Sequence, residues 1–198
     1  MDGEETIKAY KKGNKEFRII NDNLPLEPRK EMDNLGIIHY RHRNYILGDE
    51  KISDNFEGSF KEYLDYLKKE LKALVILPIY LYDHSGITIS TKPFNCPWDS
   101  SEVGYIFTTK EKIKEFYPEF NLSKKFLEEI KQNLISEITQ FDYYLKGECY
   151  GYELLTHKKC KECGHTEEDL KDSCYGFYGP IDTSGILENL PKGFKEVD

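Results

Sequence analysis

Seven residues of the kinds found in active sites lie within eighteen positions of one another near the middle of the chain. They fall in the stretch LPIYLYDHSGITISTKPFNCPWDSSEVGYIF and are Asp83, His84, Ser85, Cys96, Trp98, Asp99 and Ser100. The first chemistry to consider is nucleophilic catalysis by Cys96, with His84 as its base and a neighbouring aspartate orienting the imidazole. A catalytic thiolate usually benefits from a helix N-terminus, but Cys96 precedes Pro97 and a Trp-Asp-Ser turn. The pattern therefore does not favour a cysteine nucleophile, and it identifies no catalytic residue.

Carboxylates that bind a divalent cation would be a second chemistry, because such a site activates water for hydrolysis. The acids flanked by turn residues are Asp33, Asp49, Glu50, Asp83, Asp99 and Asp172. They form no Asp-x-Asp pair, and the chain has no phosphate loop, dinucleotide fingerprint or His-Glu-x-x-His motif. The pattern gives little support to a hydrolase.

A structural interpretation of the same stretch is favoured over both chemistries. Asp83 and Ser85 suit a hairpin turn in which short polar side chains accept bonds from backbone N–H groups, and Trp98 would fill the core beside a capped turn. A pocket lined by His42, Arg43, Asp83, His84 and Trp98 would nevertheless make a good binding site.

A Cys-x2-Cys pair indicates a metal site elsewhere in the chain. Two thiolates at this spacing can reach one tetrahedral Zn²⁺, and the ligands predicted for a structural zinc are Cys160, Cys163, His165 and Cys174, with His157 as a further possible ligand. Cys149 and Cys174 each lie eleven residues from the pair, roughly 36 Å along an extended strand, so they join it only if the chain folds back. Two alternatives stay open: a metal-free charged loop with incidental thiols, and a redox-active pair.

The elements that must position these residues follow from periodicity and caps. The sequence predicts strands at EFRIIND, within Leu35–Leu47, over Leu74–Tyr82 and Gly86–Ser90, at EVGYIFTT, and in a final pair, CYGYELLTH and SCYGFYGP. It predicts helices after Ser59, after Thr109 and from about Ser123 to Lys146. Together these elements indicate one α+β domain spanning 1–198, with a mostly antiparallel sheet carrying two or three helices on one face. Residues 1–16 are expected to be flexible, and 157–171 to form an inserted, Cys-bearing hairpin tip.

Composition and charge narrow the classes of partner. The 198 residues carry a formal charge of −8, which disfavours direct binding to nucleic acid because that needs clustered Lys and Arg. No apolar run is long enough to cross a membrane, and no signal peptide is expected. Five cysteines in such a chain indicate reduced thiols, so we expect a cytoplasmic protein.

Three separated motifs resemble a widespread family of uncharacterised proteins from bacteriophages and integrative elements. They are PRKEMDNLGIIHYRHRNYILGD, LPIYLYDHSGITISTKPFNCPWDSSEVGYIFTTKEKI and DSCYGFYG, and they span about Pro28 to Gly179. The resemblance carries no known activity, so it assigns no catalytic residue. Its motif positions, and hence the expected binding or framework residues, are Asp33, Asn34, His42, Arg43, Asp83, His84, Trp98, Asp99 and Asp172.

The resemblance implies that the gene lies in a phage or integrative element. Small accessory proteins of such elements often block host defences by binding them. The leading hypothesis is therefore a non-enzymatic inhibitor of a host defence complex, of the CRISPR type or a restriction nuclease. The alternative is a small hydrolase or nucleotide-binding protein that uses the Asp83-His84 and Trp98-Asp99 turns. The segment between the last two strands varies in the family, so a zinc there would be an addition to the fold.

Overall fold

The computed structural model describes residues 6–96, 98 and 100–197 and confirms an α+β fold. The chain divides into two compact units: a terminal unit of Met1–Leu26 and Gly147–Asp198, and a central unit of Glu27–Lys146. The sequence predicted a single domain with one sheet. The structure differs because the first and last segments of the chain build a sheet and a core of their own, whereas the middle builds another.

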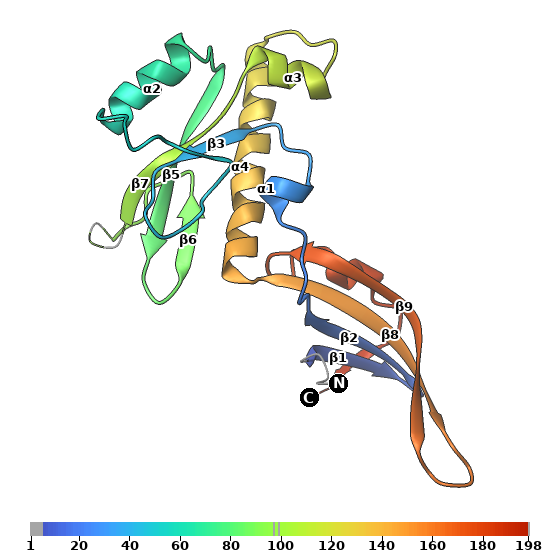
Figure 1. Cartoon of the computed structure of the whole chain (residues 1–198). Helices are drawn as coiled ribbons and strands as arrows, with labels where there is room; N and C mark the ends of the chain where they lie inside the picture. The colour runs from blue at the N-terminus through green and yellow to red at the C-terminus, as the bar shows by residue number, and fades with distance from the viewer. Residues whose placement is uncertain (1–5, 97, 99, 198) are drawn as a thin grey trace. The chain divides into compact units, whose positions relative to one another are not determined.

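The terminal unit is an antiparallel five-stranded sheet in the order β10-β1-β2-β8-β9 (Figure 1). Its strands are β1 (Thr6–Lys12), β2 (Lys15–Asn21), β8 (Cys149–Lys159), β9 (Thr166–Tyr178) and β10 (Lys195–Val197), and a short 3-10 helix, η1 (Ile186–Asn189), follows β9. Phe17 stacks on Tyr152 with ring centroids 4.9 Å apart, and both pack in one cluster with Ile19 and Ile186. Burial of these rings holds the sheet and η1 together.

Two predictions for this unit were wrong. Of the segment 1–16 predicted to be flexible, residues 1–5 lie outside the described residues, whereas 6–12 form a strand, because β1 pairs with β2 on one side and with β10 on the other. The tip predicted over 157–171 is also shorter, since β8 runs to Lys159 and β9 begins at Thr166. Only residues 160–165 lie between the two strands.

The central unit holds a second five-stranded sheet in the order β4-β3-β7-β5-β6. Its strands are β3 (Ile37–Tyr40), β4 (Glu50–Lys51), β5 (Val75–Asp83), β6 (Ile87–Ser90) and β7 (Ser100–Thr108), and its helices are α1 (Pro28–Glu31), α2 (Phe60–Lys69), α3 (Lys110–Phe116) and α4 (Lys124–Lys146). All strand pairs are antiparallel except β3 with β4. The prediction of a mostly antiparallel sheet is confirmed for both sheets.

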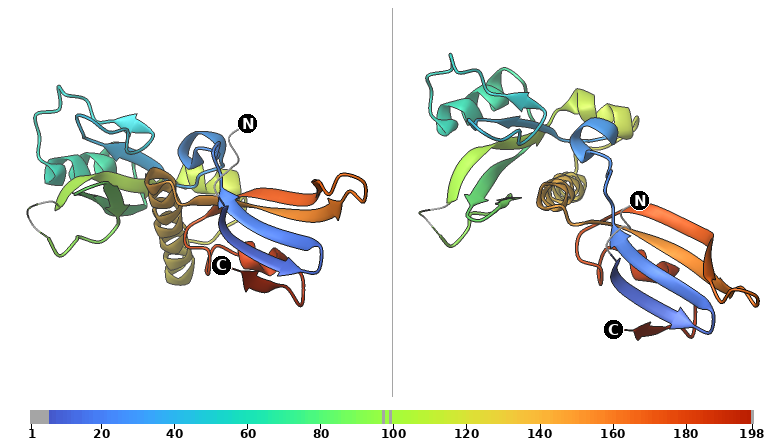
Figure 2. Two further views of the ribbon diagram at one scale, coloured as in Figure 1. Left: turned by 90° about the horizontal axis from the view of Figure 1, so that it is seen from below. Right: turned by 60° about the horizontal axis from the view of Figure 1, so that its bottom comes forward.

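Helices cover both faces of the central sheet, not one face as predicted. On β7, Ile106 packs with the buried residues of α4, whereas its neighbours Tyr105 and Phe107 pack with α2 (Figures 1 and 2). Alternate residues of a strand point to opposite faces. A strand buried on both faces is a continuous apolar run, so its sequence does not say which face a helix covers.

Local signals fix the helix starts as the sequence predicted. The Ser59 hydroxyl accepts a bond from the backbone N–H of Glu62, whose carboxylate accepts one from Ser59 N in return, which is a capping box. Thr109 caps α3 through Lys112 N, and Ser123 caps α4 through Phe126 N.

Glycine is required where the strands come closest. A Cβ at Gly104 on β7 would overlap the backbone carbonyl oxygen of His39 on β3. The register of β7 against β5 shifts at the same place, between Ile79 and Tyr80, so a β-bulge and a glycine together let the three strands twist past one another.

None of the helices in the described part of the chain is long and apolar enough to cross a membrane.

Candidate functional site

The turn after β5 carries two of the predicted residues, Asp83 and His84. It is a tight hairpin in which His84 N–H donates to Gly86 O at 3.1 Å, and Ser85 takes a left-handed φ of 57°. Asp83, His84 and Ser85 are all exposed. The turn therefore presents both side chains to solvent.

The loop after β3 meets this turn through Tyr45. The Tyr45 hydroxyl donates to the Asp83 carboxylate at 3.4 Å, and its ring stacks on His42 with centroids 4.8 Å apart. His42 Nδ1 accepts bonds from the backbone N–H groups of Asn44 and Tyr45, at 3.3 and 3.1 Å. Because Nδ1 is an acceptor, a neutral His42 carries its proton on Nε2. The structure thus brings His42 and Asp83 together, with Tyr45 as the link that the sequence did not single out.

Trp98 lies at the same end of the sheet. It comes two residues before Ser100, which pairs with Tyr82 next to the Asp83 turn. Its side chain is 91% exposed, so the prediction that Trp98 fills the core is wrong. We call His42, Tyr45, Asp83, His84 and Trp98 the turn surface.

Of the remaining predicted residues near the turn surface, Arg43 is exposed and Asp99 lies outside the described residues. Arg43 lines a shallow cavity of about 480 Å³ with Arg41, His42, Asn44, Lys51 and Asp54. The predicted pocket of five residues is therefore divided: His42 and Arg43 share this cavity, whereas Asp83, His84 and Trp98 do not line it.

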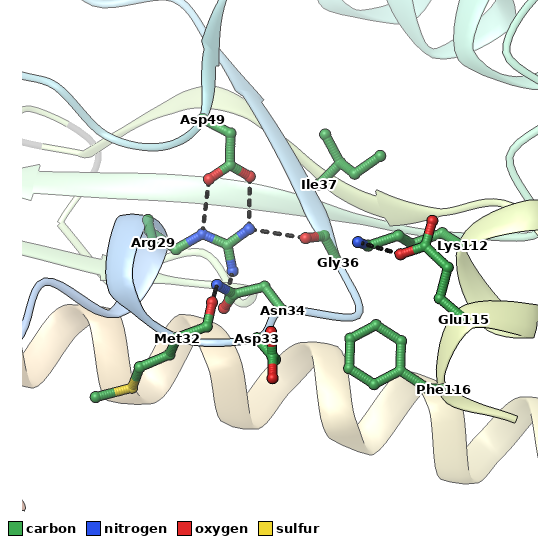
Figure 3. A pocket seen from close by; sticks show the side chains of 10 residues that line it. All are labelled: Arg29, Met32, Asp33, Asn34, Gly36, Ile37, Asp49, Lys112, Glu115 and Phe116. Carbon is green, nitrogen blue, oxygen red and sulfur yellow. Dashed lines mark hydrogen bonds and ion pairs between the residues drawn. The ribbon is translucent and has the colours of Figure 1, made fainter.

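Asp33 and Asn34 belong to a different place, a polar cavity of about 580 Å³ beside α1 and α3 (Figure 3). Its wall is the buried guanidinium of Arg29, which the sequence analysis missed. Arg29 Nε and Nη2 bind the Asp49 carboxylate, Nη1 binds Asn34 Oδ1 at 2.7 Å and Glu137 at 2.8 Å, and Nη2 also donates to Gly36 O. Asp33 is exposed at the rim.

All five N–H donors of Arg29 are thus engaged by the protein itself, leaving none for a ligand. The other cation at this cavity, Lys112, binds Glu115 at 2.7 Å and lies over the Phe116 ring. Asn34 also donates to the carbonyls of Pro28 and Met32. These contacts make Asn34 and Arg29 framework residues that fix the chain around α1.

Asp172, the last motif residue, lies in the terminal unit on β9. Its carboxylate accepts a bond from the Tyr152 hydroxyl at 3.0 Å. Because the Tyr152 ring belongs to the core of that unit, Asp172 holds a core residue in place.

The predicted zinc ligands are only partly together. Cys160, Cys163 and His165 share the short turn between β8 and β9, but Cys174 pairs with Tyr152 far along β9. His157 Nε2 lies 2.6 Å from the Glu16 carboxylate. Among residues 6–96, 98 and 100–197, no three His, Cys, Asp or Glu side chains gather closely enough to hold a metal ion. The four-ligand set is not assembled, because β8 and β9 stay paired and do not fold back.

A buried histidine, His39, is the second polar group that sequence reasoning missed. Its Nδ1 lies 2.8 Å from the Tyr63 hydroxyl, its Nε2 lies 3.2 Å from Glu50, and its ring meets Phe107 edge-on. Burial lowers the pKa of His39 and raises the pKa of Tyr63 to about 12. The only sequence signal for His39 was its position as a polar residue among the apolar residues of β3.

Comparison of the chain with protein-family models, with curated proteins and with solved structures finds no match.

Proposed function

We propose that the chain is a non-enzymatic binding protein of a phage or integrative element, and that it inhibits a host defence complex in the cytoplasm. The observation that carries the proposal is the turn surface, where an exposed tryptophan lies at the same sheet end as a hydrogen-bonded and stacked His42–Tyr45–Asp83 set. Exposed aromatic rings beside anchored polar groups are typical of residues that dominate the energy of protein interfaces.

Local rigidity supports a binding role for these side chains. The His42 ring is held by two backbone N–H groups and by the Tyr45 ring, and Tyr45 is held in turn by Asp83. Side chains that are ordered before binding lose less entropy when a partner docks. His42 and Tyr45 should therefore lose little side-chain entropy when a partner docks.

An acidic inhibitor could also bind a defence complex by mimicking nucleic acid with its carboxylates. Recognition by shape and aromatic contact fits this chain better than such mimicry. Mimicry requires unpaired carboxylates on one face, but the acids of β9 are largely neutralised: Glu168 binds Arg18, and Asp169 binds Lys158 and Lys171. We therefore expect binding to depend weakly on salt between about 50 and 200 mM, unlike binding dominated by charge.

The test is protection of an infecting phage. Host strains that each carry one defined restriction or CRISPR system would express the chain, and phage plating efficiency would be measured. We expect at least one strain to lose its defence, and the purified defence complex to bind the chain directly. Trp98→Ala should weaken that binding by about 30-fold, equivalent to about 2 kcal/mol.

A matched control is available in Leu24→Ser, because Leu24 is also 91% exposed but lies in the terminal unit. It should bind and protect like wild type. The proposal fails if no defence is weakened by folded protein, or if Trp98→Ala binds as tightly as Leu24→Ser.

A further inference from the structure

The turn between β8 and β9 is built to present two thiols. Cys160 N–H donates to His165 O at 2.7 Å and Gly164 N–H donates to Cys160 O at 3.0 Å, while Gly164 takes a left-handed φ of 72°. Cys160 and Cys163 thus lie three positions apart in one closed turn, the spacing at which two thiolates can reach a single zinc ion.

The turn supplies two ligands, whereas a structural zinc site has four. No third ligand converges on Cys160 and Cys163 among the described residues. His157 is engaged by Glu16, and Cys174 lies on β9 opposite Tyr152. His165, in the same turn, completes no such group either, which leaves two positions of a zinc ion for ligands from a second molecule.

The turn lies beyond the other strands of its own sheet. Past the Asn14 turn, where His157 N–H donates to Asn14 O, β8 and β9 are paired only with each other, and the hairpin projects beyond the rest of its sheet (Figure 1). Cys163 is exposed and Cys160 is half-buried. Residues 157–171 contain four lysines and four acids, so two identical tips carry no net charge that would repel them.

We propose that two copies of the chain bind one zinc ion between them, each through Cys160 and Cys163. The ion would be coordinated tetrahedrally by four thiolates at about 2.3 Å, and each thiol would release its proton on binding. A two-fold axis through the metal relates the copies, because each contributes the same pair. The hairpin is thus a metal-dependent dimerisation device. It is independent of the turn surface, which lies in the other unit.

The experiment uses the full chain, reduced and stripped of metal with a chelator, then titrated with zinc chloride. We expect the mass measured by light scattering to double, with one zinc per two chains at saturation. Co²⁺ in place of zinc should show the intense sulfur-to-cobalt absorption and tetrahedral visible bands of a four-thiolate site.

Variants at the exposed tip separate the ligands from their neighbours. Cys160→Ser and Cys163→Ser should each abolish the zinc-dependent doubling, whereas Cys174→Ser and His165→Ala should dimerise as wild type does. One zinc per chain without a change in mass would overturn the proposal, as would failure to retain zinc. Doubling that survives Cys160→Ser, or that is lost in Cys174→Ser, would overturn it as well.

Discussion

At the scale of single residues, His39 couples the stability of the central unit to pH. The side chain is 8% exposed, and Tyr63, Glu50 and the charge of Asp49 surround it. Tyr63 keeps its proton because its pKa is raised to about 12, so the neutral imidazole accepts from Tyr63 at Nδ1 and donates from Nε2 toward Glu50. Protonation would bury a charge and would end the bond that Nδ1 accepts from Tyr63.

We therefore predict that the protein loses stability as the pH falls below 6.5, the ordinary pKa of His39. The pKa of His39 is lower in the folded state. Above pH 6.5 the imidazole is therefore neutral in both the folded and the unfolded state, and its burial costs no stability. Below 6.5 the unfolded state binds the proton first, and the free energy of unfolding decreases by up to about 1.4 kcal/mol per pH unit until the folded pKa is reached. Urea unfolding followed by circular dichroism at pH 7.5 and 5.5 measures the difference.

His39→Gln should flatten this dependence, because glutamine does not titrate, whereas His84→Gln on the exposed turn should leave it unchanged. A His39→Gln protein that kept the wild-type pH dependence would assign the effect to another group. Glu16 does not compete in this window. Although burial raises its pKa, bonds from Arg18 and His157 hold it below 4.5.

At the scale of elements, Arg29 ties together segments that are distant in sequence. From α1 it reaches Asp49 before β4, Gly36 before β3 and Glu137 on α4. The same carboxylates also accept backbone N–H groups, Asp49 from Ile38 and Glu137 from Leu35 and Gly36. One buried cation thus organises the N-terminal edge of the central unit.

Removal of this cation should be costly, since it leaves Asp49 and Glu137 without their counter-ion in a partly buried site. We predict that Arg29→Ala lowers the free energy of unfolding by about 3–5 kcal/mol. Arg29→Lys, which keeps the charge but not the five directed donors, should lose less. Lys30→Ala on the exposed side of α1 should leave stability almost unchanged. An Arg29→Ala protein as stable as Lys30→Ala would contradict the structural role assigned to Arg29.

The elements also show which parts of the fold the sequence could predict. The helices α2, α3 and α4 have local signals, an apolar period and a Ser or Thr cap, and all three were predicted near their true starts. β1 has no such signal: TIKAYKK is charged, and besides its neighbour β2 it pairs with β10, nearly the whole chain away. Arg29 was missed for the same reason, because its partners span more than a hundred positions of sequence.

At the scale of the whole molecule, the chain passes from one unit to the other through junctions that are too short for the sequence composition to reveal. The boundaries fall between Leu26 and Glu27 and between Lys146 and Gly147, and the only composition signals there are Pro25 and Pro28 at the first and Gly147 at the second. The turn-surface residues were largely predictable by type, and all of them lie in the central unit. Their meeting through Tyr45 was not predictable, because it depends on β3 and β5 ending at the same end of one sheet.

The division makes a prediction about the central unit alone, which is one continuous segment. Residues 27–146 contain the whole of the sheet β4-β3-β7-β5-β6 and the buried clusters around α2 and α4. At about 120 residues, such a segment is large enough to bury its own core. We expect the fragment to unfold cooperatively in urea, to keep the pH dependence due to His39, and to bind the defence complex through the turn surface. It should not dimerise with zinc, because Cys160 and Cys163 are absent from it.

A fragment with no cooperative transition would show that the core of the central unit depends on the terminal unit. A folded fragment that no longer bound the partner would move the contact surface away from the β5–β6 turn.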